Sequence, residues 1–151
     1  MLNEQLDKNE IYNIAISFRT AIIKAKQNEE FTNKDRMFNF PSGCCDDSCD
    51  LLAYYLHDKY QIHVKQVNGV YRDNDFYNTT NHSWLTANDI IIDITADQFP
   101  SLIEYVNGIY VGSDSEFYEQ LDDIKFVDNY DIKENFRLWH DYQVILKYLS
   151  R

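Results

Sequence analysis

Apolar side chains recur at helical spacing in three separate parts of the chain. Between about Asn9 and Gln27 they fall three or four residues apart, which is the spacing of one face of an amphipathic helix. A second helix is predicted from about Cys45 to Tyr60, where leucines share a face with a tyrosine and acidic residues occupy the first turns. The segment from about Ile132 to Leu149 shows the same periodicity and predicts a third helix.

The region between the second and third helices has the short apolar runs and alternation that favour β-strands. Strands are expected at residues 62–67, 82–87, 90–95, 109–111 and 124–127. Asn68-Gly69 predicts a turn or bulge, residues 72–80 a polar loop, and Asn88-Asp89 the two-residue turn of a hairpin. The order of helices, strands and a final helix predicts an α+β fold, and residues 1–151 fit one domain.

Composition and charge narrow the classes of partner. The chain is 44% hydrophobic and 15% aromatic with four glycines and two prolines, as expected of a folded domain. Its net charge of −11 would repel phosphate backbones, so no nucleic-acid partner is expected. A basic or neutral substrate fits this acidic surface.

The chain also lacks signals for export or membrane insertion. Its first residues show no signal-peptide pattern, and no apolar run reaches the roughly 18 residues of a membrane span. The three cysteines lie between Cys44 and Cys49, too close together and odd in number for a disulfide framework. We therefore expect a cytoplasmic protein with no membrane partner.

Three residues have the chemistry of a cysteine-nucleophile triad. Cys45 is expected at the start of a helix, where free N–H groups and the helix dipole favour a thiolate and can hold an oxyanion. His82 would accept and return the proton, and Asp93 would orient the imidazole. The carboxylates of Asp46 and Asp47 act against activation because they disfavour a nearby thiolate.

The predicted hairpin brings the histidine and the carboxylate together. Counting outward from Asn88-Asp89 pairs Trp84 with Asp93 and His82 with Thr95. His82 and Asp93 are then diagonal neighbours on one face of the sheet, within reach of their side chains. Trp84 lies on the same face and could shield the imidazole from water.

These motifs resemble the core of the transglutaminase-like superfamily of papain-related cysteine enzymes. The resemblance rests on Gly43-Cys44-Cys45 at a helix start, His82-Ser83-Trp84 in one strand and Asp93-Ile94-Thr95 in the next, and covers residues 40–99. It implies a catalytic helix packed on an antiparallel sheet, with Cys45 as nucleophile, His82 as base and Asp93 as orienting acid. It also implies acyl chemistry on amide bonds of a peptide, protein or small molecule through a thioester, with no cofactor.

One departure from this superfamily bears on the reaction. Its transglutaminases usually carry an aromatic residue after the cysteine, where this chain has Asp46. This departure argues against protein cross-linking, and the short, acidic chain favours hydrolysis. Gln98 is a candidate for bracing the site or lining its groove.

These residues have three alternative interpretations. Cys44 and Cys49 could join Cys45 and His82 at a zinc ion, but adjacent cysteines cannot easily share a tetrahedral metal, so no metal site is predicted. Cys44 could instead resolve an oxidised Cys45. The chain could also be a non-catalytic binding module that keeps the same fold, which a blocked groove and an ordinary thiol would favour.

Overall fold

The chain folds into three helices and a five-stranded sheet, and a computed structural model describes residues 7–73, 79–127 and 131–149. The helices are α1 (Lys8–Gln27), α2 (Cys45–Tyr60) and α3 (Phe136–Tyr148). The strands are β1 (Lys65–Arg72), β2 (Thr79–Ala87), β3 (Ile90–Asp93), β4 (Tyr110–Gly112) and β5 (Asp122–Val127). Short 3₁₀ turns lie at Arg36–Asn39 (η1), Ala96–Gln98 (η2), Tyr118–Gln120 (η3) and Ile132–Glu134 (η4). The predicted α+β class is confirmed.

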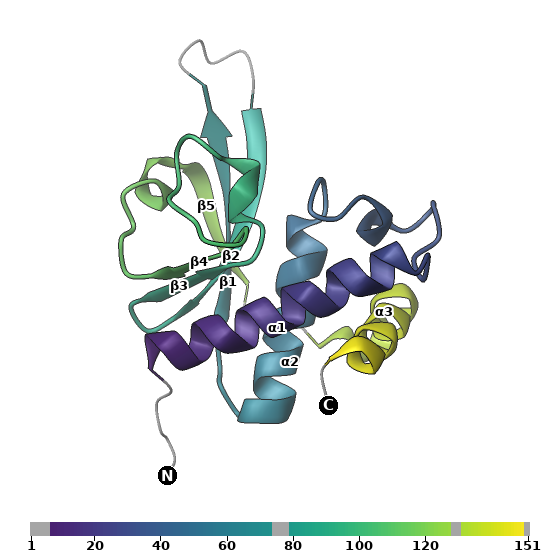
Figure 1. Cartoon of the computed structure of the whole chain (residues 1–151). Coiled ribbons are helices and arrows are strands. Elements are labelled where there is room, and N and C mark those ends of the chain that lie inside the picture. The colour runs from purple at the N-terminus through teal and green to yellow at the C-terminus, as the bar shows by residue number, and fades with distance from the viewer. Residues whose placement is uncertain (1–6, 74–78, 128–130, 150–151) are drawn as a thin grey trace.

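The sheet is antiparallel throughout, in the order β4-β3-β2-β1-β5. Figure 1 shows the helices gathered at one side of it, with α1 crossing in front of α2. Helix α2 lies against β1 and β2, while α1 contacts β3, β4 and α3. The central strand β2 is therefore packed directly on the helix that begins with Cys45.

Two hydrophobic clusters fill the molecule, one on each face of the sheet. The larger lies between the helices and the sheet and includes Phe18, Leu52, Leu85, Ile92 and Tyr142. The smaller is built from the other face of the strands and from the segments around η2 and η3, and includes Val67, Trp84, Ile91, Phe99, Phe117 and Tyr118. Successive side chains of a strand point to opposite faces of the sheet, so the sequence neighbours Trp84 and Leu85 belong to different clusters.

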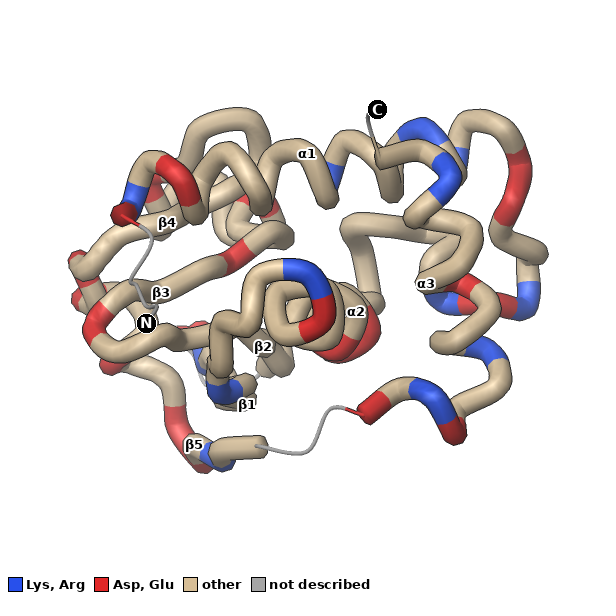
Figure 2. The backbone as a smooth tube through the Cα atoms, turned by 90° about the horizontal axis from the view of Figure 1, so that it is seen from below, with Lys and Arg blue, Asp and Glu red and all other residues tan. Residues whose placement is uncertain are grey.

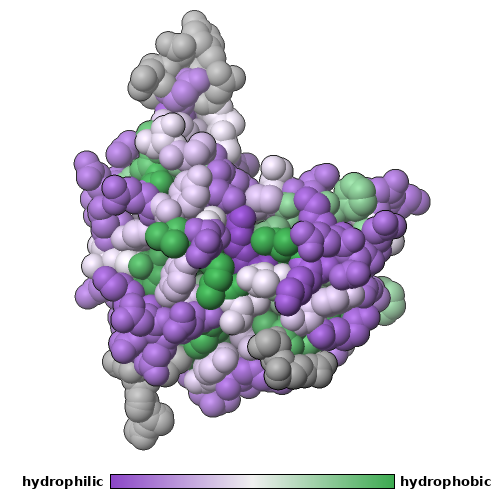
Figure 3. All heavy atoms as spheres, in the orientation of Figure 1, coloured by the Kyte–Doolittle hydropathy of each residue, from purple (hydrophilic) through white to green (hydrophobic). Residues whose placement is uncertain are grey.

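The face of the molecule seen in Figure 3 is mostly hydrophilic. In the view of Figure 3 the apolar side chains form small separate patches among hydrophilic ones, and Figure 2 shows acidic positions spread over sheet, helices and loops. In the described parts of the chain no helix is both long enough and apolar enough to cross a membrane.

The helices agree closely with the sequence predictions. Helix α2 has the predicted bounds, and α1 begins one residue early because Asp7 and Glu10 form a capping box. The third predicted helix is divided: its first turn is η4, and Asn135 then accepts a hydrogen bond from the Leu138 N–H and starts α3.

All five strands have boundaries that differ from the predictions, and β4 and β5 differ by only one or two residues at an end. Residues 62–64 precede β1, and β2 begins at Thr79 because the polar residues 79–81 pair with 70–72 of β1. Strand β3 ends at Asp93, so the predicted pairing of His82 with Thr95 is wrong. The predicted irregularity at Asn68-Gly69 is a bulge, where the β1–β5 register shifts. Residues 74–78 of the predicted polar loop lie outside the described residues.

Candidate active site

Cys45 is the first residue of α2. Gly43 precedes it with a φ of 70°, a left-handed conformation that glycine adopts without strain. Cys44 caps the helix with its backbone alone, so no Cys44 side-chain hydrogen bond occupies the first N–H groups. Cys45 is 9% exposed, and its Sγ lies 3.9 Å from the carbonyl oxygen of Asn81 in β2. The thiol therefore sits at the positive end of a helix, beside the central strand.

His82 and Asp93 meet as the hairpin count predicted. The observed pairs Leu85–Ile92, Thr86–Ile91 and Ala87–Ile90 have the predicted register. His82 Nε2 lies 2.7 Å from Asp93 Oδ2, and both side chains are buried. This distance is short enough for a charge-assisted hydrogen bond.

The Asp93 carboxylate has partners on both oxygens. Oδ2 also accepts a hydrogen bond from the Tyr118 hydroxyl at 2.8 Å. Oδ1 accepts from the Thr95 N–H at 3.1 Å and from Thr95 Oγ1 at 3.4 Å. These donors satisfy a carboxylate that would be costly to bury alone. Thr95 thus serves the site through the turn after β3, rather than through strand pairing.

The His82 imidazole is held between this carboxylate and the thiol. Burial lowers the pKa of His82, but the charge and hydrogen bond of Asp93, together with the Cys45 side chain, outweigh it and raise the pKa to about 10. Nδ1 is buried and has no hydrogen-bond partner among the described residues. With Nε2 bound to Asp93, Nδ1 is the ring nitrogen left to exchange a proton with Cys45.

Aromatic rings enclose the imidazole. Trp84 stacks on it with ring centroids 5.8 Å apart and an angle of 26°. Phe99 approaches edge-on at 4.9 Å, and Tyr118 lies on a near-parallel plane at 6.4 Å. His82 itself is 0% exposed. The predicted position of Trp84 beside His82 is confirmed, and the surrounding apolar rings strengthen the His82–Asp93 interaction by excluding water.

The acidic residues after Cys45 are bound to other groups. Asp46 Oδ1 accepts a hydrogen bond from Ser83 Oγ of β2. Asp47 pairs with Arg137 of α3, at 2.9 Å from Oδ2 to Nη1 and 3.3 Å from Oδ1 to Nη2. Arg137 therefore offsets the negative charge of Asp47, whereas the Ser83 hydroxyl fixes the position of Asp46 without neutralising it.

The other two cysteines are buried in the core. Ser48 Oγ donates to Cys44 Sγ at 3.8 Å, and burial raises the pKa of Cys44 to about 12. Burial also raises the pKa of Cys49 well above its usual value, with Cys45 among the further causes. Neither thiol has the environment of a nucleophile. Across residues 7–73, 79–127 and 131–149, no group of three or more metal-binding side chains is placed to hold an ion.

Gln98 braces the segment that leads to Cys45. Its Nε2 donates a hydrogen bond to the carbonyl oxygen of Pro41, four residues before the thiol. The side chain comes from η2, just after the Asp93 strand. Gln98 therefore ties the turn before α2 to the segment that follows Asp93, which is the bracing role considered from the sequence.

An open cavity is lined by sequence neighbours of Cys45 and His82, although not by Cys45, His82 or Asp93 themselves. It has a volume of about 520 Å³ and is lined by Asp46, Asn68, Asn81, Ser83, Asp123 and Lys125, among others. Asp46 follows Cys45 in sequence, and Asn81 supplies the carbonyl that contacts its Sγ. The lining is polar and carries both signs of charge, so it suits a hydrogen-bonding group.

Two members of the site were missed from the sequence. Tyr118 comes from an irregular segment between β4 and β5, where no periodicity points to a role. Arg137 lies 90 residues from Asp47, and its position on the amphipathic helix α3 resembles that of a surface residue. No local pattern could have indicated either contact.

Comparison of the chain with protein-family models, with curated proteins and with solved structures finds no match. The geometry around Cys45, His82 and Asp93 is therefore the main guide to function.

Proposed function

We propose that the protein is a cysteine-dependent hydrolase or acyltransferase that acts on amide bonds through a thioester intermediate, with a papain-related, transglutaminase-like architecture. The observation that carries this proposal is the buried 2.7 Å contact of His82 Nε2 with Asp93 Oδ2, with the same imidazole beside Cys45 at the first residue of α2. A thiol, an imidazole and a carboxylate in this order define a cysteine triad.

The reaction follows from the position of each group. The Cys45 thiolate attacks the amide carbonyl, and N–H groups at the start of α2 stabilise the negative oxygen of the tetrahedral intermediate. The C–N bond breaks as His82 Nδ1 gives its proton to the leaving amine, which leaves an acyl group on Sγ. His82 then takes a proton from water, hydroxide attacks the thioester, and the acid leaves as the thiol is restored. An amine in place of water gives acyl transfer.

Asp93 keeps the imidazole in the required orientation throughout. Its bond to Nε2 leaves Nδ1 toward the thiol and stabilises the imidazolium form. The carboxylate is in turn held by Tyr118 and Thr95. This mechanism requires no metal or organic cofactor, and its substrate is a peptide, protein or small amide.

The proposal is tested by the rate of iodoacetamide alkylation as a function of pH, with the labelled residue located by mass spectrometry. Cys45 is expected to react well below pH 8, and His82→Ala to shift the profile toward the roughly 8.5 of a free thiol. Labelling of Cys45 that rises only near that value in both proteins would contradict the proposal.

Acylation gives a second test with matched controls. p-Nitrophenyl acetate should acylate Cys45 and release p-nitrophenol, and Cys45→Ala should abolish this with little change in melting temperature. Cys44→Ala and Cys49→Ala each remove a buried thiol, and any that remains folded should keep the acylation. Acylation that survives Cys45→Ala would show that the nucleophile is another residue.

A second candidate function is a non-catalytic binding module on the same fold. The observation that favours it is the low accessibility of the site, because His82 is 0% exposed and Cys45 is 9% exposed. In that case Cys45 would alkylate slowly with the profile of a free thiol, and no acyl-thioester would form with any ester or amide probe.

A further inference from the structure

The second acidic residue of the nucleophile helix is both buried and paired. Asp47 is 4% exposed, and both of its oxygens contact the Arg137 guanidinium, at 2.9 and 3.3 Å. A buried carboxylate needs such a partner because an uncompensated charge in the interior is costly. Helix α3 therefore supplies the cation that neutralises the Asp47 carboxylate in the first turn of α2.

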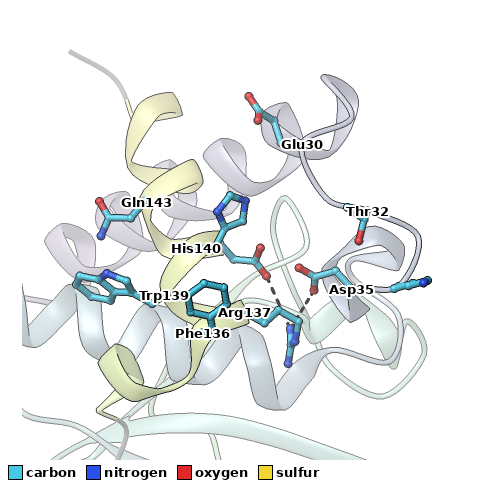
Figure 4. A pocket seen from close by; sticks show the side chains of 10 residues that line it. Glu30, Thr32, Asp35, Phe136, Arg137, Trp139, His140 and Gln143 are labelled. Atoms are coloured by element: carbon cyan, nitrogen blue, oxygen red, sulfur yellow. Dashed lines mark hydrogen bonds and ion pairs between the residues drawn. The ribbon is translucent and has the colours of Figure 1, made fainter.

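Arg137 is shared among three carboxylates. Its Nη1 lies 2.9 Å from Asp35 Oδ1 and 3.7 Å from Asp141 Oδ2. Figure 4 shows Arg137 extending toward Asp35, at the edge of a cavity of about 620 Å³ between the residues 30–35 and α3. Burial is the largest cause that raises the pKa of Asp141 to about 9, with Asp35 the next, so Asp141 keeps its proton at neutral pH. The charges that Arg137 balances are then those of Asp35 and Asp47.

Charged and titratable groups surround this turn from every neighbouring element. They are Cys44 at the N-cap of α2, Asp46, Asp47, Cys49 and Asp50 on α2, His82 on β2, Asp93 on β3, Lys26 on α1, Asp35 and Arg36 around η1, and Arg137 and Asp141 on α3. Arg36 is the other arginine near Asp47, but it lies at 3.9 Å and its side chain is 60% exposed. Solvent screens a pair of that kind, so Arg137 is the main compensating charge.

We propose that Arg137 is a positioning residue for the candidate nucleophile: it neutralises Asp47 and so allows the first turn of α2 to support Cys45 as a thiolate. The inference rests on the proposed function, because it concerns the reactivity of the same thiol. Asp47 lies two positions after Cys45 in the first turn of α2, so an unneutralised carboxylate there would oppose both the helix dipole and His82.

The test compares the pH profile of Cys45 alkylation by iodoacetamide in wild type, Arg137→Gln, Arg137→Lys, Asp47→Asn and the Arg137→Gln/Asp47→Asn double variant. For the loss of one full charge in a partly screened site, Arg137→Gln should shift the profile upward by about one pH unit, which slows labelling about tenfold at a pH below the midpoints of both proteins. Arg137→Lys should recover part of the rate. Arg36→Gln is the matched control and should stay within about twofold of wild type.

The double variant separates charge from packing. If Arg137 acts by neutralising Asp47, removing both charges should bring the rate back to within about twofold of wild type. A double variant as slow as Arg137→Gln, or an Arg137→Gln profile that coincides with wild type, would overturn the proposal. Circular-dichroism melting of each variant establishes that the measured proteins are folded.

Asp47→Asn alone keeps the inference testable if Arg137→Gln does not fold. It leaves the guanidinium in place without the Asp47 carboxylate, so the alkylation profile of Cys45 should move to lower pH, and a shift to higher pH would overturn the proposal.

Failure of the proposed function has a different signature. In that case wild-type Cys45 alkylates as an ordinary thiol and His82→Ala changes nothing, whatever the Arg137 variants do.

Discussion

Replacing Asp93 by asparagine tests whether the buried His82–Asp93 pair stabilises the fold as an ion pair. The substitution keeps the shape of the side chain and removes its charge. The pKa of His82 is raised from 6.5 to about 10, and at 1.36 kcal/mol per unit this rise corresponds to about 5 kcal/mol. Cys45, which the variant keeps, contributes part of the rise. We therefore expect Asp93→Asn to lower the free energy of unfolding by about 3 kcal/mol at pH 7, within the range found for broken buried pairs.

The pH dependence gives the sign of the effect. His82 binds its proton more tightly in the folded protein than in the unfolded chain, so its contribution to stability is complete below about pH 6.5. That contribution is lost as the pH rises from 6.5 through about 10. The stability difference between wild type and Asp93→Asn should accordingly be largest at pH 6 and shrink steadily toward pH 10.

Guanidinium unfolding at pH 6, 7, 8, 9 and 10 measures this difference, by linear extrapolation for each protein. The difference is the informative quantity because Asp141, with a pKa of about 9, titrates in the same range in both proteins. His82→Gln serves as a second reference. It has no imidazole at this position, so its free energy of unfolding should not follow the titration of His82. A difference between wild type and Asp93→Asn that stays constant from pH 6 to 10 would show that His82 is not an imidazolium in the folded state.

Three further substitutions test other parts of the structure. Tyr118→Phe removes the hydroxyl that binds Asp93 Oδ2 and should lower the free energy of unfolding by about 1 to 2 kcal/mol in guanidinium titrations at pH 7; an unchanged value would mean that this bond adds nothing. Asp141→Asn removes a buried acid whose pKa is raised to about 9. Because the folded protein holds that proton more tightly than the unfolded chain, wild type should lose stability relative to the variant as the pH rises from 5 to 8. Parallel pH curves would exclude a protonated Asp141. Phe136→Ser changes a side chain that is 93% exposed and should alter stability by no more than about 0.5 kcal/mol, so a larger loss of melting temperature would place Phe136 in a contact within the fold.

The helices and the His82–Asp93 contact could be predicted because their signals are local. Apolar periodicity located α1 and α2 to within a residue, and a two-residue turn at Asn88-Asp89 determines which positions pair on either side of it. The diagonal relation of His82 and Asp93 then followed from the alternation of side chains along strands. The end of β3 was misjudged because Ile94 continues the apolar run although the backbone turns after Asp93.

The contacts that support the site could not be predicted in the same way. The Tyr118 hydroxyl reaches Asp93 from a segment 25 residues away, and Arg137 reaches Asp47 across 90 residues. Neither tyrosines nor arginines are unusual where these two occur, and their roles arise only when η3 and α3 pack beside the hairpin and α2. From the sequence alone, Asp46 and Asp47 could therefore be recognised only as an obstacle to thiolate formation, without the contacts that bind them in the fold.

The distribution of these compensating groups has a consequence for how the site is assembled. Cys45 lies on α2, the acid–base pair on β2 and β3, the support for Asp93 on η3, and the cation for Asp47 on α3. An isolated α2 segment would hold a thiol beside two uncompensated carboxylates, which is the opposite of an activated nucleophile. High reactivity of Cys45 thus requires the packing of helices and sheet together, and Cys45 alkylation should fall to the rate of a free thiol in the same guanidinium transition that unfolds the domain.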